Sequence, residues 1–102
     1  MDQKYAFKII DKYINRLVLN KINIQSAYLF GSFAKGTFHK DSDIDLALVF
    51  DEIENIFETE VMLMTFRKDD ETIIEPHIFK KSDFVNRNPY VDEILNTGIK
   101  IL

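Results

Sequence analysis

Residues 29–49 read Leu-Phe-Gly-Ser-Phe-Ala-Lys-Gly-Thr-Phe-His-Lys-Asp-Ser-Asp-Ile-Asp-Leu-Ala-Leu-Val. This stretch joins two apolar runs, Ile24 to Phe30 and Ile44 to Phe50, through a segment of glycine, serine and charged residues. Short runs rich in β-branched and aromatic residues, bounded by glycine or polar clusters, are typical of strands. The sequence therefore predicts two buried strands whose connection carries the polar groups.

Two carboxylates flank the start of the second strand. Side chains alternate between the faces of a strand, so Asp43 and Asp45 are expected on one face and Ile44 and Leu46 on the other. The two aspartates would lie ~6.6 Å apart along the backbone, at ~3.3 Å per residue. Their side chains could then converge on divalent ions. Two cations held ~3.5–4 Å apart form the clamp that phosphoryl-transfer enzymes use.

A third carboxylate is expected from the next strand, Thr72 to Phe79. Glu75 would lie beside the aspartates if this strand neighbours theirs. Pro76 lies inside the run and favours an edge or bulged position, because proline donates no ladder hydrogen bond. His77 shares the face of Glu75 by alternation, but a structural role is the commoner one for such a histidine, and we assign it no catalytic role.

The glycine-serine pair that follows the first strand predicts an anion-binding turn. Glycine lets backbone N–H groups approach an anion closely, and a helix N-terminus attracts negative charge. Gly31, Ser32 and Lys35 therefore form a candidate triphosphate cradle. Asp41 and Ser42 are expected to shape the loop, since both residue types favour turns.

The rest of the chain predicts helices on either side of these strands. The expected elements are an amphipathic helix from Asp2 to Asn20, a short turn or helical piece from Phe33 to Lys40, helices from Ile53 to Lys68 and from Pro89 to Thr97, and a short final strand from Ile99 to Leu102. This order predicts an α/β or α+β fold in which a small mixed sheet packs against helices. A chain of 102 residues is expected to form a single domain, residues 1–102.

One face of the second long helix is predicted to join the core. Its apolar stripe consists of Ile53, Ile56, Phe57, Val61 and Met64. The spacing is helical, and the neighbouring acidic residues can then face water.

Charge is distributed unevenly along the chain. The formal net charge is −4, yet residues 1–40 carry seven bases and two acids, and residues 41–102 carry six bases and 15 acids. General nucleic-acid binding is therefore not expected, because it requires clustered lysine and arginine. The absence of cysteine excludes thiol catalysis, and no apolar stretch suffices for a membrane span. We expect a cytoplasmic protein.

The spacing of these residues resembles a known enzyme family. Gly31-Ser32, ten intervening residues and Asp43-Ile44-Asp45 match the signature of the DNA polymerase β-like nucleotidyltransferase superfamily, and the short length resembles its minimal nucleotidyltransferase (MNT) branch. The run from Glu75 to Phe79 is similar to the third-carboxylate strand of that branch.

This resemblance implies a polymerase β-like fold and residue roles. Asp43, Asp45 and Glu75 would be the catalytic residues and hold two Mg²⁺ ions, while Gly31 and Ser32 would bind the phosphates of a nucleoside triphosphate. Many MNT proteins are antitoxins paired with HEPN-domain toxins. The implied reaction is AMPylation, the transfer of AMP from ATP to a tyrosine hydroxyl of the toxin.

Two alternatives remain open at this point. The chain could neutralise its partner by occlusion as a non-catalytic binding module, a reading motivated by Phe33, by Glu75 and by the lack of an expected acceptor domain. It could also be a small-molecule nucleotidyltransferase whose acceptor pocket forms at a homo-oligomer interface.

Overall fold

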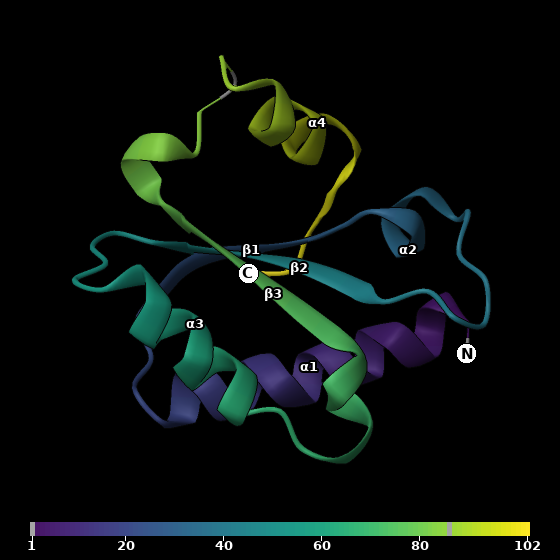
Figure 1. The fold of residues 1–102 in the computed structure, drawn as a ribbon. Coiled ribbons are helices and arrows are strands. Elements are labelled where there is room, and N and C mark those ends of the chain that lie inside the picture. Colours follow the sequence, from purple (N-terminus) through teal and green to yellow (C-terminus); the bar gives the residue numbers. More distant parts are fainter. Residues whose placement is uncertain (1, 86) are drawn as a thin grey trace.

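The computed structural model describes residues 2–85 and 87–102. Its elements are α1 (Gln3–Leu19), β1 (Ile24–Phe30), α2 (Ser32–Lys35), β2 (Ile44–Phe50), α3 (Ile56–Thr65), β3 (Ile74–Lys80), α4 (Pro89–Thr97) and β4 (Ile99–Lys100), with single 3₁₀ turns at Asp69–Ile73 and Lys81–Asp83. α1 and α3 lie on one side of the sheet, and α4 lies on the other (Figure 1). The predicted α+β architecture is confirmed.

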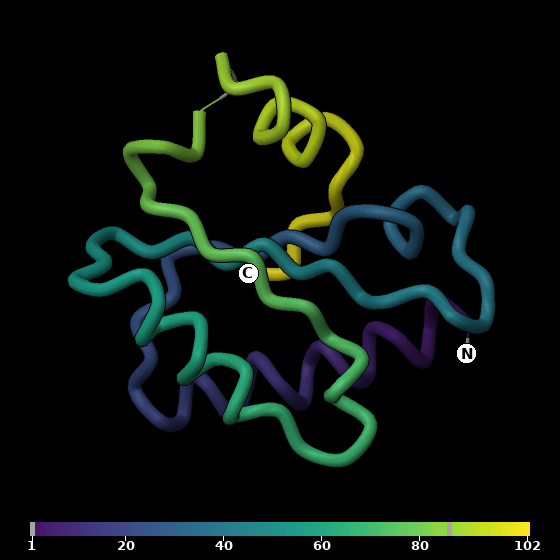
Figure 2. Tube along the Cα trace, viewed as in Figure 1, coloured from purple at the N-terminus to yellow at the C-terminus, as the bar shows by residue number. Residues whose placement is uncertain are grey.

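The four strands form one mixed sheet in the order β3-β2-β1-β4. β1 is antiparallel to both β2 and β4, whereas β2 and β3 run parallel. β3 is an edge strand, as the proline at position 76 predicts. After α4 the chain returns to the sheet and pairs beside β1, where the described chain ends (Figure 2). Within residues 2–85 and 87–102, no helix combines the length and the hydropathy that a bilayer span requires.

Helix ends follow the capping residues. Asp2 accepts a hydrogen bond from the Tyr5 amide at the start of α1, and Asn88 caps α4 ahead of Pro89, so the predicted bounds of that helix are confirmed. The second long helix is shorter than the predicted range 53–68, because the Asn55 side chain caps it and α3 begins at Ile56.

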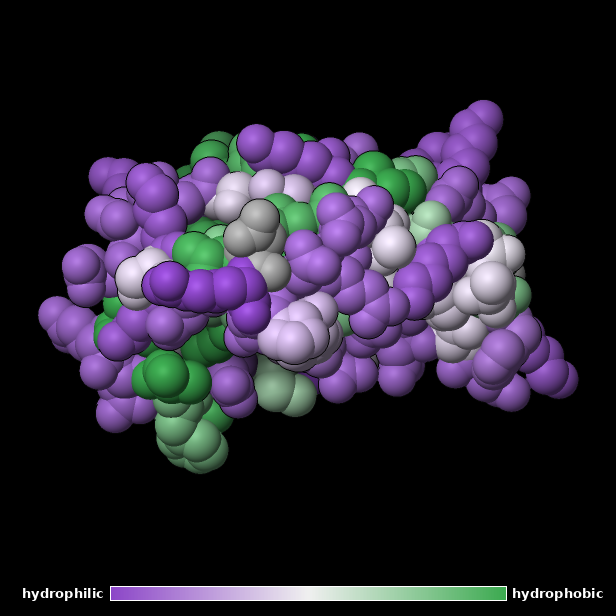
Figure 3. Space-filling view, turned by 90° about the horizontal axis from the view of Figure 1, so that it is seen from above, coloured by the Kyte–Doolittle hydropathy of each residue, from purple (hydrophilic) through white to green (hydrophobic). Residues whose placement is uncertain are grey.

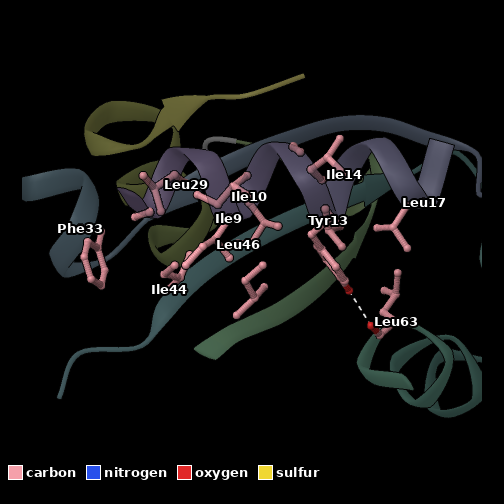
Figure 4. Packing of buried hydrophobic residues seen from close by; sticks show 14 of the residues in the cluster. Ile9, Ile10, Tyr13, Ile14, Leu17, Leu29, Phe33, Ile44, Leu46 and Leu63 are labelled. Atoms are coloured by element: carbon pink, nitrogen blue, oxygen red, sulfur yellow. Dashed lines mark hydrogen bonds between the residues drawn. The ribbon is translucent and has the colours of Figure 1, made fainter. Parts of the chain in front are cut away.

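The hydrophobic core lies between α1 and the sheet (Figure 4). α1 contributes its buried stripe, which comprises Ala6, Ile9, Ile10, Tyr13, Ile14 and Leu17. Leu46 and Leu48 of β2 and Leu29 of β1 meet this stripe. The buried hydroxyl of Tyr13 donates to the carbonyl oxygen of Leu63 at 2.5 Å and so ties α1 to α3.

The predicted core face of α3 is wrong. Four of the five residues expected inside are exposed, namely Ile56 (53%), Phe57 (74%), Val61 (44%) and Met64 (47%), and Ile53 lies before the helix and is partly buried. α3 instead packs inward through Leu63, which is fully buried, with Met62 and Phe66. Both faces of the helix are apolar, so periodicity could not select the one that meets the sheet.

An ion pair between the partly exposed Arg16 and the buried Glu71 fastens the turn before β3 to α1. The Glu71 carboxylate is fully buried, and Arg16 donates to both of its oxygens. The Lys68 amide donates to the same carboxylate at 3.0 Å. Burial alone would raise the pKa of Glu71, but hydrogen bonds from Arg16 and Lys68 outweigh it, and the pKa is lowered.

We expect Glu71→Gln to lower the free energy of unfolding by about 2 kcal/mol at neutral pH, because the neutral amide loses the charge-assisted hydrogen bonds from the partly exposed Arg16. A group whose pKa is lowered by folding stabilises the protein above its unfolded pKa, and that contribution is lost as the pH falls through the folded pKa. Urea unfolding of the wild type should therefore lose more stability on acidification than that of the variant. Asp70→Asn is the control and should have a much smaller effect, because the ion pair of Asp70 with Lys12 and its hydrogen bond from the Tyr5 hydroxyl both lie at the surface. An equal loss would contradict this account.

Candidate functional site

A group of three potential metal ligands forms where β2 and β3 begin. The parallel register pairs Asp45 with Glu75 and Ala47 with His77. Asp45, Glu75 and His77 each offer a ligand atom, and these atoms lie within 4.8 Å of one another. The expected position of Glu75 beside Asp45 is confirmed.

His77 belongs to this group, although the sequence reasoning gave it no catalytic role. Its Nε2 lies 3.1 Å from Asp45 Oδ1 and 4.0 Å from Glu75 Oε1. Its ring packs edge-on against Phe30, with ring centroids 5.1 Å apart. The register between β2 and β3 is unbroken, so Pro76 introduces no bulge. Alternation along β3 therefore predicts that His77 lies on the same face as Glu75.

Asp43 does not join the group in the part of the chain that the structure describes. β2 begins at Ile44, and Asp43 lies just before it as an exposed residue of the preceding loop. That Asp43 and Asp45 share one face stays a prediction. The two residues alternate with buried Ser42 and Ile44, although β2 itself begins at Ile44.

Gly31 lies directly against Asp45. Its neighbour Phe30 pairs with Asp45 across β1 and β2, and Gly31 adopts φ 75° and ψ −153°, a conformation essentially restricted to glycine. A Cβ atom at this position would collide with Asp45 Oδ2. Ser32, half-buried, opens the short helix α2, whose first amides have no partner within the helix. The candidate phosphate-binding turn therefore borders the carboxylate group.

Lys35 is ion-paired. Its Nζ lies 2.7 Å from Glu93 Oε1, and both side chains are largely solvent-exposed. The sequence predicts Lys35 as a cation for phosphate binding, and in the structure Lys35 pairs with Glu93 on α4. The pair borders a hollow of about 180 Å³ that is lined by Phe30, Gly31, Lys35, Tyr90, Glu93, Ile94 and Thr97.

A second, larger hollow of about 380 Å³ lies on the β3 side of the group. It is lined by Glu60, Met64, Arg67, Glu75, Pro76, His77, Ile78, Phe79 and Tyr90. Glu75 and His77 thus face an open groove that residues of α3 continue.

Tyr90 lines both hollows. Its ring packs edge-on against Phe30 and Phe79, each with centroids 5.9 Å away. Partial burial raises the pKa of its phenol, and the negative charges of Asp45, Glu75 and Glu93 raise it further. Tyr90 is therefore part of the electrostatic environment of the carboxylates, a role that sequence reasoning did not identify.

The loop between α2 and β2 is held by its own hydrogen bonds. Ser42 Oγ accepts from the His39 amide at 2.9 Å, and the Asp41 amide donates to His39 Nδ1 at 3.3 Å. Phe33 is buried and stacks on Phe38, with centroids 4.6 Å apart. The aromatic residue after Ser32 therefore serves the core.

The donor set fits a divalent cation. Carboxylate oxygens suit Mg²⁺ and Mn²⁺, and an imidazole nitrogen suits Mn²⁺ and later transition metals. Asp45, Glu75 and His77 supply both donor types within one compact group. A second cation would need Asp43 as a further ligand.

Comparisons with known proteins agree on one family. The family model described as "Polymerase beta, Nucleotidyltransferase" matches residues 12–102. A candidate protein adenylyltransferase of Methanocaldococcus jannaschii is 25% identical over 97 residues, which cover 92% of this chain and 93% of that protein. The protein adenylyltransferase MntA of Shewanella oneidensis is 47% identical over 47 residues, which cover 45% of this chain and 34% of MntA.

Two crystal structures share the fold. A candidate nucleotidyltransferase of Sulfolobus solfataricus superposes with a TM-score of 0.71 at 20% sequence identity, over 96% of this chain and 80% of that one. A mutant of the toxin–antitoxin pair MntA–HpeT contains a chain that superposes with a TM-score of 0.54 at 19% identity, over 98% of this chain and 72% of that one.

The contact between Gly31 and Asp45 can be tested with a pair of glycine variants. Gly31→Ala should displace the Asp45 carboxylate and weaken Mn²⁺ binding, and its strained backbone should cost about 1–3 kcal/mol of stability. Gly36→Ala is the control, because Gly36 also has positive φ but open space around it; it should cost about 1 kcal/mol and leave Mn²⁺ affinity unchanged. Calorimetric Mn²⁺ titration and urea unfolding measure both quantities, and equal Mn²⁺ affinities in the two variants would contradict the assignment.

The shared electrostatic environment of Tyr90 and Asp45 predicts a titration shift. Asp45→Asn should lower the pKa of Tyr90, because it removes a negative charge that disfavours the phenolate. NMR titration of ¹³C-labelled tyrosine follows this group. Asp41→Asn provides the comparison and should leave the Tyr90 resonance titrating as in the wild type; an unchanged titration in Asp45→Asn would show that the two groups are not coupled.

Proposed function

Since this chain belongs to the polymerase beta nucleotidyltransferase family, and is therefore a nucleotidyltransferase, we propose that it transfers AMP from ATP to a tyrosine hydroxyl of a partner HEPN-domain toxin. The chain would then be the antitoxin of a toxin–antitoxin pair. The observation that carries the proposal is the β2–β3 register, which sets Glu75 beside Asp45 across from the Gly31–Ser32 turn.

The proposed reaction joins two substrates at this site. The acceptor oxygen forms a bond to the α-phosphorus of ATP, the bond from that phosphorus to the bridging oxygen of pyrophosphate breaks, and the hydroxyl proton is released. Gly31 and Ser32 would orient the phosphates through backbone amides and the serine hydroxyl. Glu75 is exposed to the larger hollow, so its carboxylate can take up the acceptor proton.

Cations are needed because the site is acidic. Asp43, Asp45 and Glu75 would repel a triphosphate, and Lys35 is already paired with Glu93. Bound Mg²⁺ would neutralise phosphate charge and polarise the reacting oxygens. Asp45 and Glu75 are the residues that would hold one ion, with Asp43 as a ligand of a second. His77, within hydrogen-bond distance of Asp45, would orient that carboxylate.

The proposed acceptor follows from the relatives. MntA of Shewanella oneidensis is named a protein adenylyltransferase, and a solved structure contains MntA and HpeT as a toxin–antitoxin pair. A protein acceptor also suits the open groove beside Glu75 and His77, because residues of α3 continue the groove along the surface.

Neutralisation by occlusion is the second candidate. It is favoured by the Lys35–Glu93 pair, because Glu93 competes with a phosphate for the lysine beside Gly31. In that case the protein would inhibit the toxin by binding alone, and its carboxylates would be dispensable.

The two candidates predict opposite results for one variant. With ATP labelled in the α-phosphate, Mg²⁺ and a purified HEPN-domain protein of the same organism, the wild type should transfer label to a tyrosine of that protein. Asp45→Asn should reduce transfer at least about 100-fold, because removal of a charge-stabilising catalytic group typically costs that much. It should also fail to neutralise the toxin.

The matched control is Asp51→Asn, an exposed acidic residue at the other end of β2. It should retain full transfer. Neutralisation by Asp45→Asn at the wild-type level would support occlusion, and absence of transfer by the wild type would reject the adenylyltransferase proposal.

A further inference from the structure

The outer face of α3 presents large apolar side chains to solvent. We define the α3 patch as its four exposed apolar residues, Ile56, Phe57, Val61 and Met64. Hydrophobic side chains project from the left side of the molecule in Figure 3, the side on which α3 lies in Figure 1. Because Phe57 is 74% exposed, burial of its side chain contributes little to the stability of the fold.

This exposure is not explained by packing within the chain. α3 already meets the core through Leu63 on its inner side. A helix that is apolar on both sides is normally buried, and a contiguous exposed apolar patch on a domain marks an interaction surface.

The α3 patch continues into the groove of the candidate site. Met64, the last residue of the patch, lines the 380 Å³ hollow together with Glu75 and His77. Glu60, one turn before Met64, lines it as well. A molecule seated on the patch would therefore reach the carboxylates directly.

The charges around the patch define what it fits. Glu54, Glu58 and Glu60 are exposed beside it, and α3 contains no lysine or arginine. The nearest cation in the sequence, Arg67, is engaged with the carbonyl oxygens of Met64, Thr72 and Ile74. A complementary surface is apolar at its centre and carries lysine or arginine at its rim. A symmetric contact between two copies of α3 would instead bring the glutamates face to face.

We propose that the α3 patch docks the protein that supplies the acceptor hydroxyl, and that it recognises an apolar surface flanked by basic residues on that protein. The proposal rests on the proposed function in taking the acceptor to be a protein. Docking on α3 would place the acceptor at the Glu75 side of the site, opposite the Gly31–Ser32 turn where ATP would bind. The patch thereby serves as a selectivity device separate from the chemistry.

The test uses the double variant Phe57→Ser/Val61→Ser. Neither residue lines the 380 Å³ hollow or belongs to the group of potential metal ligands. Its affinity for the purified HEPN-domain protein, measured by calorimetry, should fall at least about 10-fold, as expected for loss of an aromatic anchor. Label transfer to that protein should fall in parallel. Binding of fluorescent ATP with Mg²⁺ should remain at the wild-type level.

The control is Val18→Ser/Leu19→Ser. These residues are as exposed, at 50% and 82%, and Val18 lines a separate hollow that contains no residue of the site. This variant should bind and transfer like the wild type. Circular dichroism and thermal unfolding verify that both double variants fold, which surface substitutions should permit.

The outcomes separate docking from chemistry. The docking proposal would be overturned by unchanged affinity of the α3 variant for the HEPN-domain protein, by equal losses of affinity in both double variants, or by absence of wild-type binding. It would also be overturned if the wild type is a dimer and the only effect of the α3 substitutions is to make the protein monomeric. Patch-dependent binding without transfer of label would support docking and reject adenylyl transfer. Glu58→Lys should slow association and weaken its salt dependence, since it reverses one rim charge.

Discussion

The parallel pairing of β2 with β3 is the constraint on which the site depends. It sets Asp45 opposite Glu75, and one step of alternation then brings His77 to the same face. A shift of one residue would turn every side chain of a strand to the other face. The register that buries Leu46 and Ile74 therefore also places the potential metal ligands on the opposite face of the sheet. The ion pair of Arg16 with the buried Glu71 anchors the turn that leads into β3, so core packing and the geometry of the potential metal ligands depend on one element.

Much of this arrangement could be predicted from the sequence, because the strands carry strong local signals. The apolar runs 24–30 and 44–50 became β1 and β2 with the predicted bounds, and Pro76 correctly indicated an edge strand. Adjacency of Glu75 and Asp45 followed from strand order. Which way the Asp43 side chain faces is less predictable, because Asp43 lies one residue before β2, next to a loop held by the hydrogen bond from the His39 amide to Ser42 Oγ.

The unpredicted features are those that depend on contacts between distant segments. Lys35 meets Glu93 across 58 positions of sequence, and His77 acquires a role only through its contact with Asp45. The orientation of α3 is the instructive case. Two apolar faces satisfied the helical period, and the hydrogen bond from Tyr13 to the Leu63 carbonyl oxygen accompanies the face that turns inward. Periodicity identifies a face only when the opposite face is polar.

The negative charge of residues 41–102 has two roles in the proposed function and docking. At the potential metal ligands, Asp45 and Glu75 would make cations a condition for holding a triphosphate, so in the proposed function nucleotide binding would depend on metal. Along α3, the glutamates beside the α3 patch disfavour a second copy of the chain and favour a basic partner. The two functions are spatially continuous through Met64, which belongs to the patch and also lines the groove of the ligand group. Under the proposed docking, specificity for the acceptor would change by substitution on α3, while the geometry of the potential metal ligands, set by the sheet, would be preserved.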